Sequence, residues 1–137
     1  MPVQQGELTI VIPKESLTDM ALENLQKIIA NKETLFQRAF RTDSTEIEIT
    51  EEKINFTWFL YTTDNDEISA YTQFISRLCG MARNAKRVSA KPTETDNDKY
   101  AFHCFLLRLS FIGKEHKTAR KILLRNLMGN SAFRSAK

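Results

Sequence analysis

The chain has 137 residues, of which 42% are hydrophobic and 27% charged, and this ordinary mix indicates one folded domain rather than a disordered chain. Four Gly and three Pro exclude a collagen-like or linker-like chain, and two Cys are too few for a dense disulfide framework. No apolar run reaches the ~18 residues that a membrane helix needs. The net charge of +3 conceals two opposed halves, because residues 1–76 hold 6 Lys+Arg and 13 Asp+Glu (−7) and residues 77–137 hold 14 and 4 (+10).

An N-terminal strand segment is predicted over residues 1–15. Its strand covers residues 7–12, which are rich in β-branched side chains, and Pro13 ends it because proline has no N–H to donate to a neighbouring strand. Apolar residues then recur at helical spacing over residues 22–40, which predicts helix. We expect a break at Asn31 that divides this stretch into two helices.

A β-hairpin is predicted next. Residues 46–50 and 54–61 alternate between apolar and polar side chains, and residues 51–53 form a short polar connection. The second strand is expected to turn one strongly apolar face toward helices, and this face consists of Ile54, Phe56, Trp58 and Leu60. The opposite face is expected to carry Asn55, Thr57, Phe59 and Tyr61.

Two further helices follow the hairpin. The first is predicted over about residues 67–87. The second begins after a cap at Thr95 or Asp96 and runs to about Ile112. This second helix is apolar nearly all round, which is typical of a helix buried at the centre of a fold.

The last predicted helix spans about residues 114–128, stops at Gly129, and leaves residues 130–137 as a flexible tail. The order of strand, helix, two strands and three helices does not continue as βαβ units, which argues against a doubly wound parallel sheet. We therefore expect a single α+β domain over residues 1–137, in which a small three-stranded antiparallel sheet packs against a bundle of three C-terminal helices.

Four side chains are candidates for metal or nucleophile chemistry: Cys79, Cys104, His103 and His116. They form no Cys-x-x-Cys motif and no His pair at ligand spacing, and both Cys lie in apolar helical stripes, where a free thiol acts as a small hydrophobe. A Cys–His pair that meets only in space stays open. The sequence also has no Gly-rich phosphate loop, so we expect no metal, no cofactor and no enzyme activity.

Two basic clusters lie in the C-terminal half. The first lies at the end of the helix predicted over residues 67–87 and in the loop that follows, and it contains Arg83, Lys86, Arg87 and Lys91. The helix dipole stabilises cations near a helix C-terminus, so local stability is enough to explain this cluster. It is nevertheless a candidate part of an anion-binding face.

The second basic cluster lies in the last predicted helix and contains Lys114, Lys117, Arg120, Lys121 and Arg125. Lys117, Lys121 and Arg125 follow at intervals of four, which places three cations on one helix face. Lys114 and Lys117 occupy the first turn, where the helix dipole disfavours cations, so helix stability does not explain them. Two interpretations stay open: a solvated face, and a face that binds an external anion.

Three segments resemble a known group of small proteins. They are residues 20–29 (MALENLQKII), 96–113 (DNDKYAFHCFLLRLSFIG) and 120–134 (RKILLRNLMGNSAFR), within a likeness that covers about residues 20–134. The group is the family labelled "virulence-related" on integrative and conjugative elements of gut Firmicutes. Its label names no activity, so the resemblance implies no catalytic residue. It implies a mobile-element context, in which small proteins handle DNA, regulate transfer or block host defence.

These observations lead to one main hypothesis and one alternative. The main hypothesis is a non-enzymatic mobile-element accessory protein that binds nucleic acid through the two basic clusters, mainly by salt-dependent phosphate contacts. The alternative is a protein-interaction module that inhibits a host nucleic-acid-binding or defence protein, in the manner of an anti-CRISPR protein, with the acidic N-terminal half as its binding face. Residues 1–6 lack the basic and apolar regions of a signal peptide, so we expect a cytoplasmic location and no membrane partner.

Overall fold

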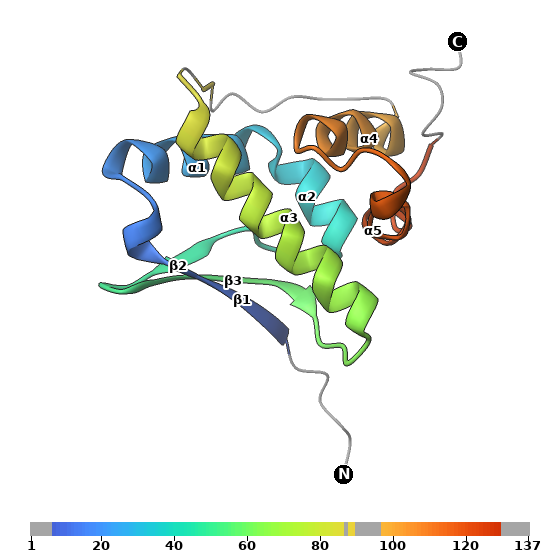
Figure 1. Cartoon of the computed structure of the whole chain (residues 1–137), viewed down its shortest axis with the longest axis horizontal. Helices are drawn as coiled ribbons and strands as arrows, with labels where there is room; N and C mark the ends of the chain where they lie inside the picture. Colours follow the sequence, from blue (N-terminus) through green and yellow to red (C-terminus); the bar gives the residue numbers. More distant parts are fainter. Residues whose placement is uncertain (1–6, 87, 90–96, 130–137) are drawn as a thin grey trace.

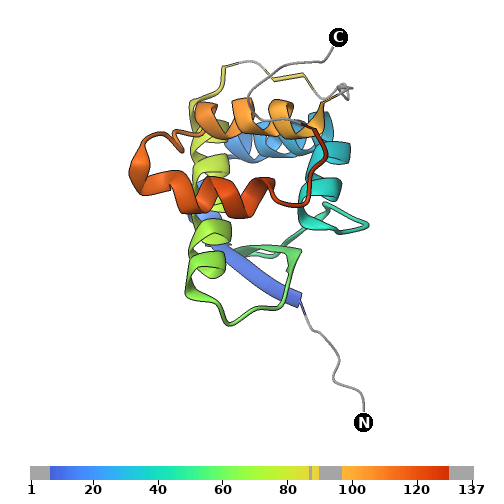
Figure 2. The same cartoon turned by 90° about the vertical axis from the view of Figure 1, so that its right-hand side faces the viewer.

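A three-stranded antiparallel sheet and five α-helices make up the described part of the chain (Figure 1). The computed structural model describes residues 7–86, 88–89 and 97–129, so the predicted tail over 130–137 lies outside the described residues. In both views the helices lie on one side of the sheet, and the three helices after the hairpin pack together (Figure 2), which confirms the α+β fold class. In chain order the elements are β1 (Glu7–Pro13), η1 (Lys14–Ser16), α1 (Asp19–Asn31), α2 (Glu33–Phe40), β2 (Ile47–Ile49), β3 (Lys53–Leu60), α3 (Asn65–Asn84), α4 (Asp98–Arg108), η2 (Lys114–His116) and α5 (Lys117–Leu124).

The central strand of the sheet is β3, which pairs antiparallel with β1 on one side and with β2 on the other. The pairing with β1 steps from Ile10–Phe56 to Leu8–Phe59, so β3 has one extra residue between these pairs. This bulge reverses the alternation at the end of β3, where Phe59 is buried and Leu60 is 51% exposed. The prediction that Leu60 shares the apolar face and that Phe59 lies opposite is therefore wrong at this end of the strand.

The predicted break between the first two helices is confirmed one residue after Asn31. Lys32 has φ −107° and ψ 16°, and it both ends α1 and begins α2. The start of α1 is fixed by Thr18, whose hydroxyl oxygen accepts a hydrogen bond of 3.0 Å from the backbone N–H of Ala21.

An aromatic cluster joins the sheet to the helices. Its central ring is Phe36 of α2, which is fully buried and whose centroid lies 5.5–6.0 Å from four other ring centroids. These rings come from β3, α3 and α4 and belong to Trp58, Phe74, Phe102 and Phe105. The sheet and three of the helices therefore share one core, held largely by ring packing.

The helix at the centre of the fold is α3, which contacts α1, α5 and β1 and carries fully buried side chains along its length. The prediction that the helix after residue 96 is the central one is wrong. That helix, α4, lies in the outermost layer (Figure 2), and its Leu107 is 38% exposed. Its first turn is capped by Asn97, whose side-chain oxygen accepts a hydrogen bond of 3.0 Å from Tyr100 N. The expected caps, Thr95 and Asp96, lie outside the described residues.

The apolar run that suggested a long central helix is divided by a turn. Helix α4 ends at Arg108, and Ser110 has a φ of 72°, in the left-handed region. Because the chain turns here, Leu109 and Phe111 enter the core from outside the helix. The apolar residues of α4 and those of the turn after it therefore look, in the sequence, like one helix that is apolar on every side.

The last predicted helix also begins differently. Residues 114–116 form the short turn η2, and α5 starts only at Lys117. Gly113, immediately before η2, has a φ of 93°, a conformation that favours glycine. Beyond the end of α5, Leu127 is buried and holds the following segment against the core.

Candidate functional site

The first predicted basic cluster lies at the end of α3. The Nη1 group of Arg83 donates a hydrogen bond of 3.4 Å to the backbone carbonyl of Ser16, and Lys86 is exposed. Arg87 and Lys91 lie outside the described residues. Figure 1 places the end of α3 and helix α5 in different parts of the molecule, so Arg83 and Lys86 do not extend the second basic cluster.

Three lysines of the second cluster form an exposed group that we call the lysine face: Lys114, Lys117 and Lys121. Within the described ranges none of them forms an ion pair. The first turn of α5 has no acidic residue, and the nearby Glu115 lies with its Oε2 atom 3.8 Å from Nε2 of His116. The lysine face therefore has no intramolecular counter-charge among the residues that the structure describes.

Arg120 has a structural role in the same helix. Its Nη1 group donates to the backbone carbonyls of Phe111 (2.9 Å) and Gly113 (3.0 Å). The guanidinium thus satisfies the carbonyls of the turn that leads into η2. The predicted cation Arg120 therefore binds backbone carbonyls of its own chain.

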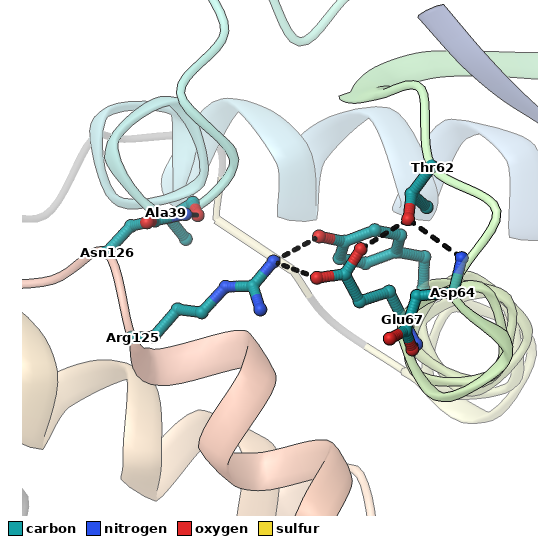
Figure 3. A network of polar contacts seen from close by, with 7 residues as sticks. Ala39, Thr62, Asp64, Glu67, Arg125 and Asn126 are labelled. Atoms are coloured by element: carbon teal, nitrogen blue, oxygen red, sulfur yellow. Dashed lines mark hydrogen bonds and ion pairs between the residues drawn. The ribbon is translucent and has the colours of Figure 1, made fainter.

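Arg125 is the predicted cation that the structure engages most fully, in the network of Figure 3. Its Nη2 group lies 2.8 Å from Oε2 of Glu67 and donates to the Tyr71 hydroxyl at 3.3 Å. The other oxygen of Glu67 accepts a hydrogen bond from the Thr62 hydroxyl, and that hydroxyl oxygen accepts from Asp64 N at 3.0 Å. Of the three cations on one helix face, Lys117 and Lys121 remain unpaired in the described structure while Arg125 is paired.

The pKa values of the two acidic groups in the network, the Glu67 carboxyl and the Tyr71 phenol, are both shifted. Hydrogen bonds from Thr62 and Arg125 hold the pKa of the Glu67 carboxyl below its usual value of 4.5. Burial raises the pKa of the Tyr71 phenol above 10.0, against the opposing effect of the Arg125 charge. Glu67 is therefore ionised and Tyr71 protonated at neutral pH, and the Arg125–Glu67 contact is a true ion pair.

A cavity of about 330 Å³, which we call the Arg125 cavity, opens beside this network. Part of its wall is a stacked pair of rings, Phe59 and Tyr71, whose centroids lie 4.5 Å apart with an interplanar angle of 16°. Asn126 lines it as well, and its Nδ2 group donates to the Ala39 carbonyl at 2.9 Å, which joins the end of α5 to α2. Among the described residues, the lining consists of Phe40, Arg41, Phe59, Leu60, Tyr61, Thr62, Glu67, Tyr71, Arg125 and Asn126.

The sequence reasoning did not select the cavity residues other than Arg125. One signal was available, because Asp64 and Glu67 have the spacing of a capping box, and Asp64 Oδ1 does accept a hydrogen bond of 3.0 Å from Glu67 N. That motif places Glu67 in the first turn of α3. It does not show that Arg125, on another helix, is the partner of its carboxylate.

The hairpin carboxylates of the acidic half lie apart from the lysine face. Glu46, Glu48, Glu51 and Glu52 are all exposed on or beside the β2–β3 hairpin, at the opposite side of the molecule from α5 (Figure 1). None of these carboxylates pairs with a cation of the described residues, although Glu48 Oε1 accepts from Asn55 Nδ2 at 2.9 Å. Charge segregation is therefore preserved in space for these hairpin carboxylates, whereas Glu67 of the same half pairs with Arg125.

The candidate residues for metal and nucleophile chemistry lie apart from these features. In the part of the chain with described coordinates, no group of three His, Cys, Asp or Glu side chains is placed to hold a metal ion. Burial raises the pKa of the Cys79 thiol to about 11, so this thiol is protonated at neutral pH and is not an activated nucleophile. None of the described helices combines the length and the apolar character that crossing a membrane requires.

Comparison with protein-family models, with curated proteins and with solved structures finds no match to this chain. Function is therefore inferred from the side chains and their arrangement.

Proposed function

We propose that this protein binds nucleic acid through the phosphate backbone, with the lysine face as the contact surface. The observation that supports the proposal is the exposure of Lys114, Lys117 and Lys121 without a carboxylate partner among the described residues. Two of these lysines stand at or before the start of α5, where the helix dipole opposes a positive charge. An external polyanion stabilises such an arrangement.

The lysine side chain suits this role. An ammonium group is a compact point charge on a flexible stem, and it contacts phosphate without reading the base sequence. Lys117 and Lys121 are one turn apart on α5, so both can contact one stretch of backbone. Arg120 and Arg125 are positioning residues in this proposal, because their guanidinium groups fix the turn before η2 and the end of α5.

The proposed role is that of a non-enzymatic accessory protein. The resemblance to small proteins of integrative and conjugative elements supports a setting in which DNA is handled during transfer. The protonated state of Cys79 argues against thiol catalysis at neutral pH. Arg83 and Lys86 add positive charge elsewhere on the molecule and are not part of the proposed contact.

A second candidate function is inhibition of a nucleic-acid-binding protein. The exposed hairpin carboxylates Glu46, Glu48, Glu51 and Glu52 favour it, because unpaired acidic groups at one edge of a fold can occupy a site that normally binds phosphates. A complex with a nuclease or a defence protein that survives digestion of all nucleic acid supports this alternative. Loss of the complex on digestion supports the main proposal.

Binding to labelled oligonucleotides in rising salt tests the proposal directly. Three phosphate contacts predict a slope of log K against log salt of about −2.7 for duplex DNA and about −2.1 for a single strand. We expect weak binding, with a Kd on the order of 10⁻⁴ M at physiological salt. Absence of binding at 50 mM salt, or binding that does not respond to salt, contradicts the proposal.

A further inference from the structure

The lysine face leads directly to the Arg125 cavity. Arg125 follows α5 with helical backbone angles (φ −64°, ψ −24°) and lies four residues after Lys121 on the same face. Four residues of helix rise by about 6 Å along the axis. A polyanion that contacts Lys117 and Lys121 therefore passes beside the cavity.

The cavity combines aromatic surface with hydrogen-bonding groups. Tyr61 lines it and is 59% exposed, so its ring is accessible to a ligand. Tyr71, which is half-buried and stacks on the buried Phe59, supplies further ring surface in the wall. Glu67 and Arg125 place acceptor and donor atoms among these rings. Rings beside a few fixed polar groups suit a flat heteroaromatic ligand.

Arg125 is held in one orientation but still has donors to offer. Its contacts with Glu67 and Tyr71 both use Nη2, and a guanidinium carries five N–H groups. The N–H groups on Nη1 and Nε therefore remain available to a ligand, as far as the described residues are concerned. Because Glu67 and Tyr71 fix the plane of the group (Figure 3), little side-chain freedom is lost when a ligand binds.

A second cation stands at another wall of the cavity. Arg41 follows α2 in the left-handed region (φ 54°, ψ 48°), is exposed, and forms no ion pair with any described residue. Arg41 and Arg125 thus bring positive charge to the cavity from the end of α2 and from the end of α5. Lys121 lies one helical turn before Arg125. This arrangement allows a nucleic-acid strand to insert one group into the cavity while the phosphates on either side of that group contact the cations.

We propose that the Arg125 cavity accepts one unstacked nucleobase, so that the ligand of this protein is single-stranded nucleic acid. The inference rests on the proposed function, because the lysine face must hold the phosphate backbone while the base enters. Tyr61 contributes the stacking surface, Arg125 and Glu67 contact the edge of the base, and Arg41 contacts a neighbouring phosphate. A base stacked on an aromatic side chain of this kind typically changes affinity by roughly fivefold or more.

The test compares two ligands with the same number of phosphates: hexathymidylate and a fully abasic hexamer, both followed by fluorescence anisotropy at 50 mM salt. We expect hexathymidylate to bind at least fivefold more tightly. Tyr61→Ala should remove this difference and leave binding of the abasic hexamer unchanged. Arg41→Gln should weaken both ligands alike. Ile112→Ala, at a side chain that is 60% exposed and outside the cavity lining, is the matched control and should change neither.

Amide chemical shifts locate the bound base independently of affinity. Hexathymidylate should shift the amides of Tyr61, Thr62 and Asn126, and the abasic hexamer should shift mainly those of the lysine face. Equal binding of the two hexamers overturns the base-binding inference and leaves the proposed function intact. Failure of both hexamers to bind overturns the proposed function itself. A uniform loss of binding to both hexamers in Tyr61→Ala also contradicts the inference, because it shows that Tyr61 does not act through the base.

Discussion

Oε2 of Glu67 lies 2.8 Å from Nη2 of Arg125, and this contact ties the first turn of α3 to the end of α5. The two side chains come from halves of the chain that carry opposite net charge. The contact removes one cation from the predicted basic face, and it fixes the helix that carries the other two, Lys117 and Lys121.

The Glu67–Arg125 contact predicts a pH-dependent contribution to stability. The pKa of Glu67 in the folded chain is below its usual value of 4.5, so the stabilisation is complete above about pH 4.5 and is lost as the pH falls through the lowered folded-state value. Because the pair is partly exposed, we expect Glu67→Gln to cost about 1 kcal/mol at neutral pH, which is more than an exposed pair on one helix contributes. Thermal unfolding of the unaltered protein and of the Glu67→Gln variant between pH 3 and 7 measures this difference in stability. The two Tm values should converge at the acid end of the range.

The control for this prediction is Glu23→Gln, which removes an exposed i,i+4 partner of Lys27 at 3.3 Å. Such a pair is worth about 0.2–0.5 kcal/mol. A Glu67→Gln effect that is no larger than this, or one that persists unchanged at pH 3, contradicts the network as described.

A buried asparagine caps the end of α3 from a neighbouring helix. Asn24 is 6% exposed, and its Nδ2 group donates to the carbonyls of Ala82 (3.2 Å) and Ala85 (3.1 Å). Asn24→Leu removes both donors and leaves two carbonyls poorly satisfied, which we expect to cost about 1–3 kcal/mol in urea unfolding. Gln26→Leu, at an exposed position of the same helix, should change stability by no more than about 0.5 kcal/mol. Equal effects of the two substitutions would show that the Asn24 bonds are unimportant.

The sequence was sufficient to predict the order of the elements and the fold class, because period-2 and helical patterns are local. The end of β3 shows where this reasoning fails. A single extra residue between the Ile10–Phe56 and Leu8–Phe59 pairs exchanges the faces of Phe59 and Leu60. Nothing in the alternation of β3 alone marks the bulge, since it depends on pairing with β1.

The position of the helices in the core shows the same limit. The run after residue 96 is apolar all round, yet the chain turns at Ser110 and only part of the run is helix. Helix α3 looks less apolar in sequence and is nevertheless the central helix, because it lies between the sheet, α1 and α5. Burial is thus decided by tertiary neighbours that a pattern along one helix does not contain.

The basic face was predictable only in part. Helical spacing correctly places Lys117 and Lys121 on one face of α5. The same spacing gives no information on the carboxylate that meets Arg125, nor on the carbonyls that accept from Arg120. Those partners are distant in sequence or belong to the backbone, so only the fold reveals them.

The state of Cys79 predicts its chemical reactivity. The thiol is buried and its pKa is about 11, so little reactive thiolate forms at pH 8. In a Cys104→Ser variant, we expect alkylation of Cys79 by iodoacetamide to be slow in the native protein and fast after unfolding in urea, as measured by mass spectrometry. Rapid native labelling at pH 7 would reveal an activated thiol and would contradict a non-enzymatic role.

The most direct test of the central claim compares two charge-matched triple variants in duplex DNA binding between 50 and 200 mM salt. Lys114→Gln/Lys117→Gln/Lys121→Gln removes the lysine face, and Lys14→Gln/Lys27→Gln/Lys53→Gln removes the same charge elsewhere. The account predicts that the slope of log K against log salt falls from about −2.7 to near zero only in the first variant, at about 0.9 per lost contact. Equal slopes in the two variants would show that net charge, and not this face of α5, governs binding, and would contradict the account.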